Sequence, residues 1–251
     1  MKVQEMALLN VQGVTKRFGG LVALNNVELS IKEGEIVGLI GPNGAGKTTL
    51  FNIICGFYKP DAGKVEFDGR NITGMKPYEI CKLGISRTFQ IPRPFPDLTA
   101  IYNVALAVMY GKDRANMSLG DALLDAAHYL EFVGLLRKRD VLARDLTPFE
   151  LRLLELARAL ATTPKLLLID ETMAGLNPVE CERALELINR ARDEFKLTIC
   201  WIEHVMRIIM KAAERVVVLH YGMKIAEGAP EEVARDVKVI EAYLGERRAR
   251  G

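Results

Sequence analysis

The sequence has no long apolar run, no export signal, little net charge and no paired spacing of cysteines. No apolar stretch approaches the ~18–20 residues that cross a bilayer, so any membrane association is expected to come through a partner. The N-terminus lacks the basic segment followed by an apolar one that is typical of an export signal. The net charge of +2 gives no reason to expect a nucleic-acid partner.

The four cysteines are scattered along the chain, at Cys55, Cys81, Cys181 and Cys200. This spacing favours the reduced thiols of a cytosolic protein over a disulfide framework or a zinc site. Of the 251 residues, 49% are apolar and 26% charged, which is the composition of an ordinary globular protein. The length is enough for one large domain or two small ones.

One short segment carries the clearest chemical signal. Residues 41–48 read Gly-Pro-Asn-Gly-Ala-Gly-Lys-Thr and match the phosphate-binding loop of ATPases and GTPases. The apolar run Ile36–Ile40 before it predicts a buried parallel strand, and a helix is expected after it. In such a unit, backbone N–H groups and the helix N-terminus face the phosphates. We therefore expect Lys47 to contact the β- and γ-phosphates of a nucleotide, and Thr48 to bind Mg²⁺.

A second apolar run ends in two carboxylates. Residues 165–169 predict a buried strand, and Asp170 and Glu171 follow at its C-terminal end, where open α/β sheets bind ligands. Asp170 is suited to hold Mg²⁺ through water, and Glu171 is suited to orient or deprotonate an attacking water. His204 follows the next predicted strand, at 197–202, and from there it can reach a γ-phosphate.

The remaining pattern predicts an α/β protein in three regions. Residues 8–75 are expected to form mainly strands and turns around the phosphate-binding loop. Three prolines break regular structure over 92–97, and the residue spacing over 99–162 is helical. From position 165 onward strands and helices alternate, which predicts a parallel sheet covered by helices. Residues 246–251 are expected to be a solvated tail.

Six motifs, taken in order, resemble those of the ATP-binding subunits of ABC transporters, and the resemblance covers nearly the whole chain. They are Phe18, at the position of the aromatic that stacks on adenine; the phosphate-binding loop; Gln90, the Q-loop glutamine in Arg-Thr-Phe-Gln; the pair Asp170 and Glu171; Ala-Gly-Leu-Asn at 174–177, the D-loop with Asn in place of the usual Asp; and His204, the switch histidine. Six motifs in order are far more specific than any one of them alone.

The resemblance implies one ATP-binding domain over 1–251. Its α/β fold would combine a P-loop NTPase core of mostly parallel sheet, an antiparallel β subdomain and a helical subdomain at about 91–162. ATP and Mg²⁺ are the implied ligands. Transmembrane permease subunits would hold the cytoplasmic chain at the inner face of the membrane. A second ATP-binding subunit, identical or different, would complete a head-to-tail dimer, and no nucleic acid is implied.

The site residues implied by the resemblance form three groups. The catalytic group is Glu171, His204, Gln90 and Lys47. The metal group is Thr48, Gln90 and Asp170. The nucleotide-binding group is Phe18, Asn43, Gly44, Ala45, Gly46, Lys47, Thr48 and Thr49.

Within the family, the sequences of several segments most resemble those of importers of branched-chain amino acids. These segments are Ser-Arg-Thr-Phe-Gln at 86–90, Ala-Gly-Leu-Asn-Pro at 174–178, Trp-Ile-Glu-His at 201–204 and Glu-Ala-Tyr-Leu-Gly-Glu at 241–246. The alternatives are the ATPase subunit of a lipopolysaccharide-type exporter, and a nucleotide-gated dimerising module with weak hydrolysis. A soluble relative acting on DNA or ribosomes is disfavoured, because long insertions and a second cassette are missing.

The signature segment departs from the family pattern. Where the family usually has Leu-Ser-Gly-Gly-Gln, residues 146–150 read Leu-Thr-Pro-Phe-Glu. Thr147 and Glu150 predict a capping box, and Pro148 fits the first helical position, so we expect the helix start to survive. In the family this segment contacts the γ-phosphate of the ATP bound to the partner subunit. There Pro148 would remove an N–H, Phe149 would add bulk, and Glu150 would add negative charge.

These changes predict asymmetric hydrolysis in a heterodimer. Loss of one N–H that binds phosphate costs ~1.5–3 kcal/mol, which is roughly a ten- to hundredfold loss of rate when it is expressed in the transition state. The P-loop of this chain would then work with the intact signature of its partner. A second departure, Thr172 in place of the usual proline, is expected to loosen the turn after Glu171.

Overall fold

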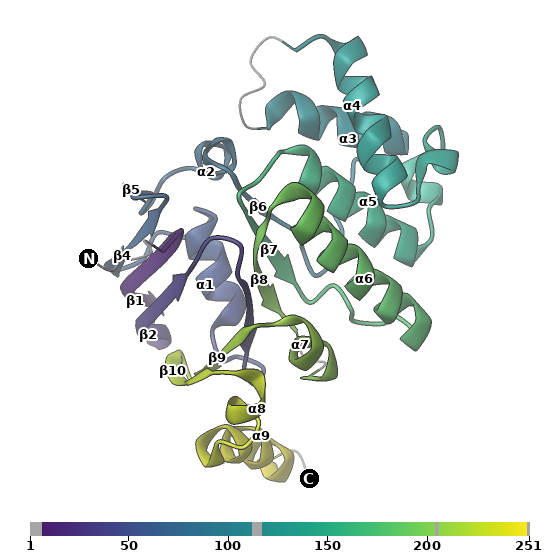
Figure 1. Ribbon diagram of the computed structural model, residues 1–251. Helices are drawn as coiled ribbons and strands as arrows, with labels where there is room; N and C mark the ends of the chain where they lie inside the picture. The colour runs from purple at the N-terminus through teal and green to yellow at the C-terminus, as the bar shows by residue number, and fades with distance from the viewer. Residues whose placement is uncertain (1–6, 112–116, 204–205, 250–251) are drawn as a thin grey trace, which may run out of the picture. The chain divides into compact units, whose positions relative to one another are not determined.

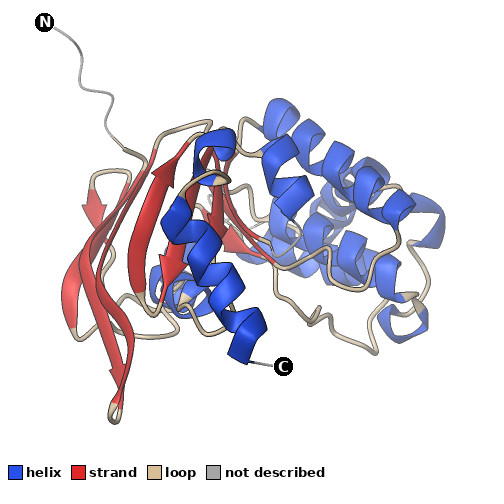
Figure 2. Ribbon diagram, turned by 90° about the horizontal axis from the view of Figure 1, so that it is seen from below, coloured by secondary structure: helices blue, strands red, loops and turns tan. Residues whose placement is uncertain are grey.

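The computed structural model describes residues 7–111, 117–203 and 206–249. The chain divides into two compact units. The first comprises residues 1–77 and 198–251, and the second comprises residues 78–197. The first unit is rich in strands and the second in helices. Figure 2 draws the strands in red and the helices in blue.

An antiparallel sheet with strand order β2-β1-β4-β5 belongs to the first unit. Its strands are β1 (Leu9–Phe18), β2 (Leu21–Ile31), β4 (Ala62–Phe67) and β5 (Arg70–Asn71). Val11 of β1 pairs with Leu29 on one side and Val65 on the other, and all three side chains are buried. Because side chains in a strand alternate between faces, this register puts the three apolar side chains on one face.

The first unit also contains four strands in the order β10-β9-β3-β8. β3 (Ile36–Ile40) runs parallel to both β8 (Thr198–Ile202) and β9 (Arg215–His220), while β10 (Met223–Gly228) is antiparallel to β9. Every residue of β3 and β8 is buried, as parallel strands covered on both faces require.

Four helices accompany these strands: α1 (Lys47–Ile54), α7 (Met206–Ala212), α8 (Pro230–Val233) and α9 (Val237–Ala249). The predicted strand and helix on either side of the phosphate-binding loop are confirmed as β3 and α1. At the other end of the chain, α9 continues to Ala249, into the segment expected to be a solvated tail. The Glu, Arg and Ala residues of that segment are good helix formers.

The second unit contains two parallel strands, β6 (Ile85–Arg87) and β7 (Leu166–Asp170). Its helical elements are α2 (Pro77–Leu83), α3 (Ala100–Tyr110), α4 (Leu119–Phe132), α5 (Pro148–Ala161), α6 (Pro178–Phe195) and the 3₁₀ turns η1 (Leu136–Lys138) and η2 (Ala143–Asp145). Helices α3, α4 and α5 pack against one another (Figure 1).

The helices predicted over 99–162 are thereby confirmed. Residues at the helix ends account for two of the breaks between them. Gly111 follows the end of α3, and the Ser118 side chain caps α4 by accepting the backbone N–H of Asp121 at 3.2 Å. The three prolines over 92–97 lie in a segment without helix or strand, as predicted. The domain boundaries, including a helical subdomain at about 91–162, stay a prediction.

Candidate functional site

The phosphate-binding loop joins the last residue of buried strand β3 to the first residue of α1. The N-cap of α1 is Gly46, with a φ of 101°, so it has no side chain to cap the helix, and the first turn contains no acidic residue. The first turn of a helix leaves its N–H groups without partners inside the helix, and its dipole favours negative charge. This helix start is therefore suited to an anion such as phosphate.

Three glycines shape the loop. A Cβ on Gly41 would lie 2.1 Å from the backbone oxygen of Leu219, and one on Gly46 would lie 2.6 Å from that of Ala23, so both positions exclude larger residues. Gly44 has a φ of 78° and nothing within 4 Å of a built Cβ. Its backbone conformation favours glycine, and the space beside it is open to a ligand.

Lys47 folds back over this loop. Its side chain is buried, and Nζ donates to the backbone oxygens of Gly41 at 2.7 Å and Pro42 at 3.0 Å. Phosphate oxygens that replaced these carbonyls would meet the same ammonium group. Around it, Asn43, Gly44 and Thr48 are exposed, Gly46 and Thr49 are half-buried, and Ala45 is buried. The accessible residues thus include Thr48, whose hydroxyl is the predicted Mg²⁺ ligand.

Phe18 ends β1 with 42% of its surface exposed. Its ring meets Tyr58 edge to face at a centroid distance of 5.2 Å, and Lys16 Nζ lies 5.5 Å from its centroid. The neighbours hold the ring while part of its surface stays accessible. An accessible, oriented aromatic ring fits the predicted stacking on adenine.

In the second unit, the predicted metal ligand Asp170 is the last residue of the fully buried strand β7. Its Oδ2 lies 2.5 Å from Nη2 of Arg87, and both side chains are buried, at 3% and 6% exposure. A buried charge requires a partner of opposite charge, and Arg87 supplies one. Sequence reasoning missed this role, although Arg87 lies three residues before Gln90.

The structure brings together two residues that the sequence assigned to catalysis. Nε2 of Gln90 donates to Oε2 of Glu171 at 2.7 Å. Glu171 has a φ of 49°, a left-handed conformation that is uncommon and costly for a residue other than glycine. The bond to Gln90 fixes the direction of the carboxylate, so the pair can hold a water molecule in one place.

The predicted capping box of the signature segment is confirmed. Thr147 Oγ1 accepts the N–H of Glu150 at 3.3 Å, and Oε2 of Glu150 accepts the N–H of Thr147 at 3.0 Å, with Pro148 as the first residue of α5. The other oxygen of Glu150 lies 2.6 Å from Nζ of Lys138. Burial on its own raises the pKa of Glu150, but the bonds from Lys138 and Thr147 outweigh this and lower the pKa.

The structure gives two residues of this segment partners that were not expected. The negative charge of Glu150 is paired, because both of its oxygens are bonded, one of them to the ammonium of Lys138. Phe149, which was expected to add bulk, packs against neighbouring groups. Its half-buried ring lies 5.6 Å from the guanidinium of Arg183 on α6, and it lines an apolar pocket. Neither contact is visible in the local sequence.

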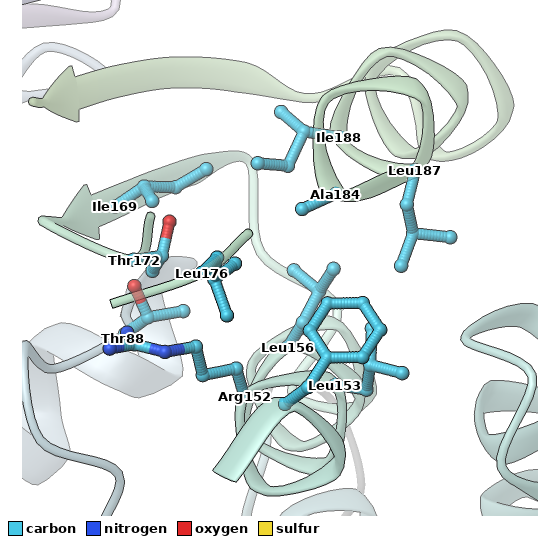
Figure 3. Close-up of a pocket in the computed structure, with 11 residues that line it drawn as sticks. Thr88, Arg152, Leu153, Leu156, Ile169, Thr172, Leu176, Ala184, Leu187 and Ile188 are labelled. Carbon is cyan, nitrogen blue, oxygen red and sulfur yellow. The ribbon is translucent and has the colours of Figure 1, made fainter. Parts of the chain in front are cut away.

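That pocket lies beside the turn that follows Glu171. Its volume is about 30 Å³. It is lined by residues of α5, α6 and β7 and of the segments that follow β6 and β7: Thr88, Phe149, Arg152, Leu153, Leu156, Ile169, Thr172, Leu176, Ala184, Leu187 and Ile188 (Figure 3). Thr172 is the residue that stands where the family usually has proline. Its Oγ1 is buried and makes no hydrogen bond within the described parts of the chain. The departure therefore leaves a polar atom among apolar side chains.

The remaining predicted catalytic residue, His204, lies outside the described residues. Within the ranges that the structure covers, no cluster of three or more His, Cys, Asp and Glu residues could hold a metal ion. The donors predicted for Mg²⁺ are the hydroxyl of Thr48, the amide oxygen of Gln90 and the carboxylate of Asp170. Oxygen donors of this kind fit the preference of Mg²⁺.

A glycine loop between a buried parallel strand and an uncapped helix, with a lysine folded over it, defines a P-loop nucleotide-binding protein. Comparison with known families agrees. The profile of the family described as "ABC transporter" matches residues 24–174. A second profile, "Branched-chain amino acid ATP-binding cassette transporter", matches residues 223–249.

Individual proteins give the same result. The chain is 40% identical to the high-affinity branched-chain amino acid transport ATP-binding protein BraF of Pseudomonas aeruginosa, over 95% of this chain and 98% of the relative. It is 42% identical to the corresponding LivG protein of Salmonella typhimurium, with the same coverage. The chain therefore belongs to the ATP-binding proteins of ABC transporters, a family of ATPases.

A solved structure confirms the predicted fold class. The crystal structure of the ADP conformation of an ATP-binding cassette of an ABC transporter superposes with a TM-score of 0.85 at 32% identity. The match covers 96% of this chain and 99% of that one. The α/β P-loop NTPase fold expected from the motifs is thus the fold of the chain.

Proposed function

We propose that this chain is the ATP-hydrolysing subunit of an importer of branched-chain amino acids. The observation that carries the hydrolytic part is the 2.7 Å bond between Gln90 and Glu171, which orients a carboxylate directly after the buried strand β7. The transported class is supported by the BraF and LivG proteins, both named for branched-chain amino acid transport. An exporter subunit and a weakly hydrolysing module gain no support from these relatives.

ATP binding is assigned to the first unit. The ammonium of Lys47 and the N–H groups at the start of α1 meet the phosphates, where they stabilise the charge that develops during phosphoryl transfer. Phe18 stacks on adenine. The loop residues Asn43, Gly44, Ala45, Gly46, Thr48 and Thr49 complete the cradle. His204 is assigned to the γ-phosphate by the resemblance alone.

Water activation is assigned to the second unit. Glu171 accepts a proton from water or aligns it, and Gln90 holds the carboxylate in the direction that this requires. Thr48, Gln90 and Asp170 would hold Mg²⁺. When bound, Mg²⁺ neutralises charge on the phosphate oxygens. The guanidinium of Arg87 pairs with the carboxylate of Asp170 and holds it in place at the end of β7.

The partners follow from this role. We assign transmembrane permease subunits, contacted near residues 90–103, and a second ATP-binding subunit in a head-to-tail dimer. None of the described helices combines the length and the apolar character that a membrane crossing needs. The chain would therefore lie at the inner face of the membrane through its permeases.

Phosphate release by the purified chain with Mg-ATP tests the hydrolytic part. Lys47→Ala and Glu171→Gln are expected to lower the rate by at least a hundredfold, since one removes a phosphate contact and the other the water-activating carboxylate. Lys64→Ala is the matched control, because this exposed lysine lies in the antiparallel sheet and pairs there with Glu66. Equal loss in all three variants would contradict the assignment.

A further inference from the structure

Another carboxylate of the second unit, that of Glu155, lies beside the loop that carries Gln90. Glu155 is on α5 and is only 5% exposed. Its Oε1 accepts the backbone N–H of Phe89 at 3.0 Å, and its Oε2 makes no hydrogen bond within the described residues. A buried carboxylate is costly, so a single bond to a loop N–H calls for an explanation.

The groups around Glu155 are cationic. Arg152 and Arg158 on its own helix and Arg87 on β6 all favour its charged form. Arg93 lines the same cavity, which has a volume of about 250 Å³ and to which α3 contributes only Ala107. Within the described residues, four guanidinium groups thus surround the carboxylate of Glu155, but none of them donates a hydrogen bond to it.

The residue that Glu155 contacts is next in sequence to one member of the pair Gln90 and Glu171. Phe89 precedes Gln90, and Gln90 donates to Glu171 at 2.7 Å. The N–H of Phe89 belongs to the peptide group between Thr88 and Phe89. The hydrogen bond to Glu155 therefore restrains the backbone directly before Gln90. Two guanidinium groups also lie over the Phe89 ring, those of Arg87 at 5.1 Å and Arg93 at 5.4 Å.

We propose that Glu155 is a positioning residue for ATP hydrolysis, which fixes the loop at Phe89 and thereby aims Gln90 at Glu171. The inference rests on the proposed function, because Gln90 and Glu171 take their roles from it. In this role Glu155 acts on Gln90 through the backbone of Phe89. Its effect is carried by one backbone hydrogen bond, so removing the acceptor is the direct way to detect it.

The protonation of Glu155 gives a readout that a packing role would lack. Burial raises the pKa of Glu155 to about 7, while the N–H of Phe89 and the neighbouring arginines act in the lowering direction. A carboxylate accepts a hydrogen bond more strongly than a neutral carboxyl group does. The hold on Phe89 therefore tightens as pH rises through this range.

Two substitutions separate the acceptor from the packing. Glu155→Gln keeps an oxygen for Phe89 and imitates the protonated form, whereas Glu155→Leu keeps most of the volume and removes the acceptor. For the wild type, kcat for phosphate release is expected to rise about fivefold between about pH 6 and about pH 8.5. Glu155→Gln is expected to follow a flat pH profile, with a kcat close to that of the wild type at about pH 6. Glu155→Leu is also expected to follow a flat profile, with a kcat about tenfold below that of the wild type at about pH 8.5.

Amide hydrogen exchange at Phe89 provides the second measurement and needs no turnover. Glu155→Leu is expected to speed exchange at Phe89 about tenfold or more, while Glu155→Gln changes it little. Glu232→Leu is the control, since it removes a carboxylate that accepts the N–H of Ala229 in the first unit. Exchange at Phe89 should not respond to it.

The outcomes distinguish this inference from the proposed function. Unchanged exchange at Phe89 in Glu155→Leu would overturn the inference, whether or not the chain turns over. So would equal pH profiles for the wild type and Glu155→Gln in a chain that hydrolyses ATP. Failure of the proposed function would instead appear as phosphate release that survives Lys47→Ala and Glu171→Gln.

Discussion

At the scale of single residues, the hydroxyl of Thr172 is a polar atom in an apolar pocket (Figure 3). Burying a hydroxyl without a hydrogen bond costs about 1–3 kcal/mol. We expect Thr172→Val, which keeps the shape and replaces the hydroxyl by a methyl group, to raise the free energy of unfolding by about 1 kcal/mol. Denaturant unfolding followed by circular dichroism measures this change.

Thr73 provides the matched control. Its Oγ1 accepts the N–H of Val65 at 2.8 Å in the antiparallel sheet. Thr73→Val should therefore lower the free energy of unfolding by about 1 kcal/mol, because it leaves that N–H without an acceptor. A loss of stability in both variants would show that the Thr172 hydroxyl has a partner, and the account of the pocket would be wrong.

Glu155 also makes stability depend on pH. Its pKa is raised from 4.5 to about 7 in the folded chain, so the folded state binds the proton more tightly than the unfolded state. The resulting stabilisation is full below about pH 4.5 and is lost as pH rises through about 7. The free energy of unfolding of the wild type, relative to Glu155→Gln, should fall by about 3 kcal/mol over this range. A difference that stays constant with pH would contradict the assignment.

At the scale of elements, the N-terminus of α6 accommodates the asparagine that stands in the D-loop in place of the usual aspartate. Oδ1 of Asn177 accepts the N–H groups of Val179 and Glu180, both at 3.0 Å, and Glu180 completes a capping box. Asparagine and aspartate are comparable N-caps, whereas alanine is not. Asn177→Asp should leave the free energy of unfolding nearly unchanged, and Asn177→Ala should lower it by about 1 kcal/mol. The melting temperature reports both changes. Val179→Ala, at a position 78% exposed, is the control without effect.

The elements show what the sequence can and cannot predict. The units β3–loop–α1 and Thr147–Glu150 were predictable because their signals lie within a few residues of each other. The pairs Arg87–Asp170, Phe89–Glu155 and Lys138–Glu150 join residues far apart in sequence. Such pairs depend on how elements pack, which a local pattern does not encode. For this reason the pairing of Glu150 with Lys138 and the contact of Glu155 with Phe89 were missed, whereas Asp170 and Glu171 could be proposed from one local pattern.

At the scale of the whole molecule, the altered signature still predicts asymmetry between the two ATP sites of a dimer. The ion pair with Lys138 reduces the repulsion expected between Glu150 and the phosphate of the partner's ATP. Pro148, however, still lacks the N–H that would donate to that phosphate. In a heterodimer with an intact partner signature, Lys47→Ala in this chain should abolish most hydrolysis. The equivalent change in the partner should leave most of it. Equal losses would mean that both signatures support hydrolysis.

The central claim is that ATP hydrolysis by this chain drives the import of branched-chain amino acids. The most direct measurement is ATP-dependent uptake of labelled leucine by vesicles that contain this chain with its permease subunits and second ATP-binding subunit. We predict uptake with the wild type, little uptake with Lys47→Ala and a normal rate with Lys64→Ala. Normal ATP hydrolysis without leucine uptake, or undiminished uptake with Lys47→Ala, would contradict the account.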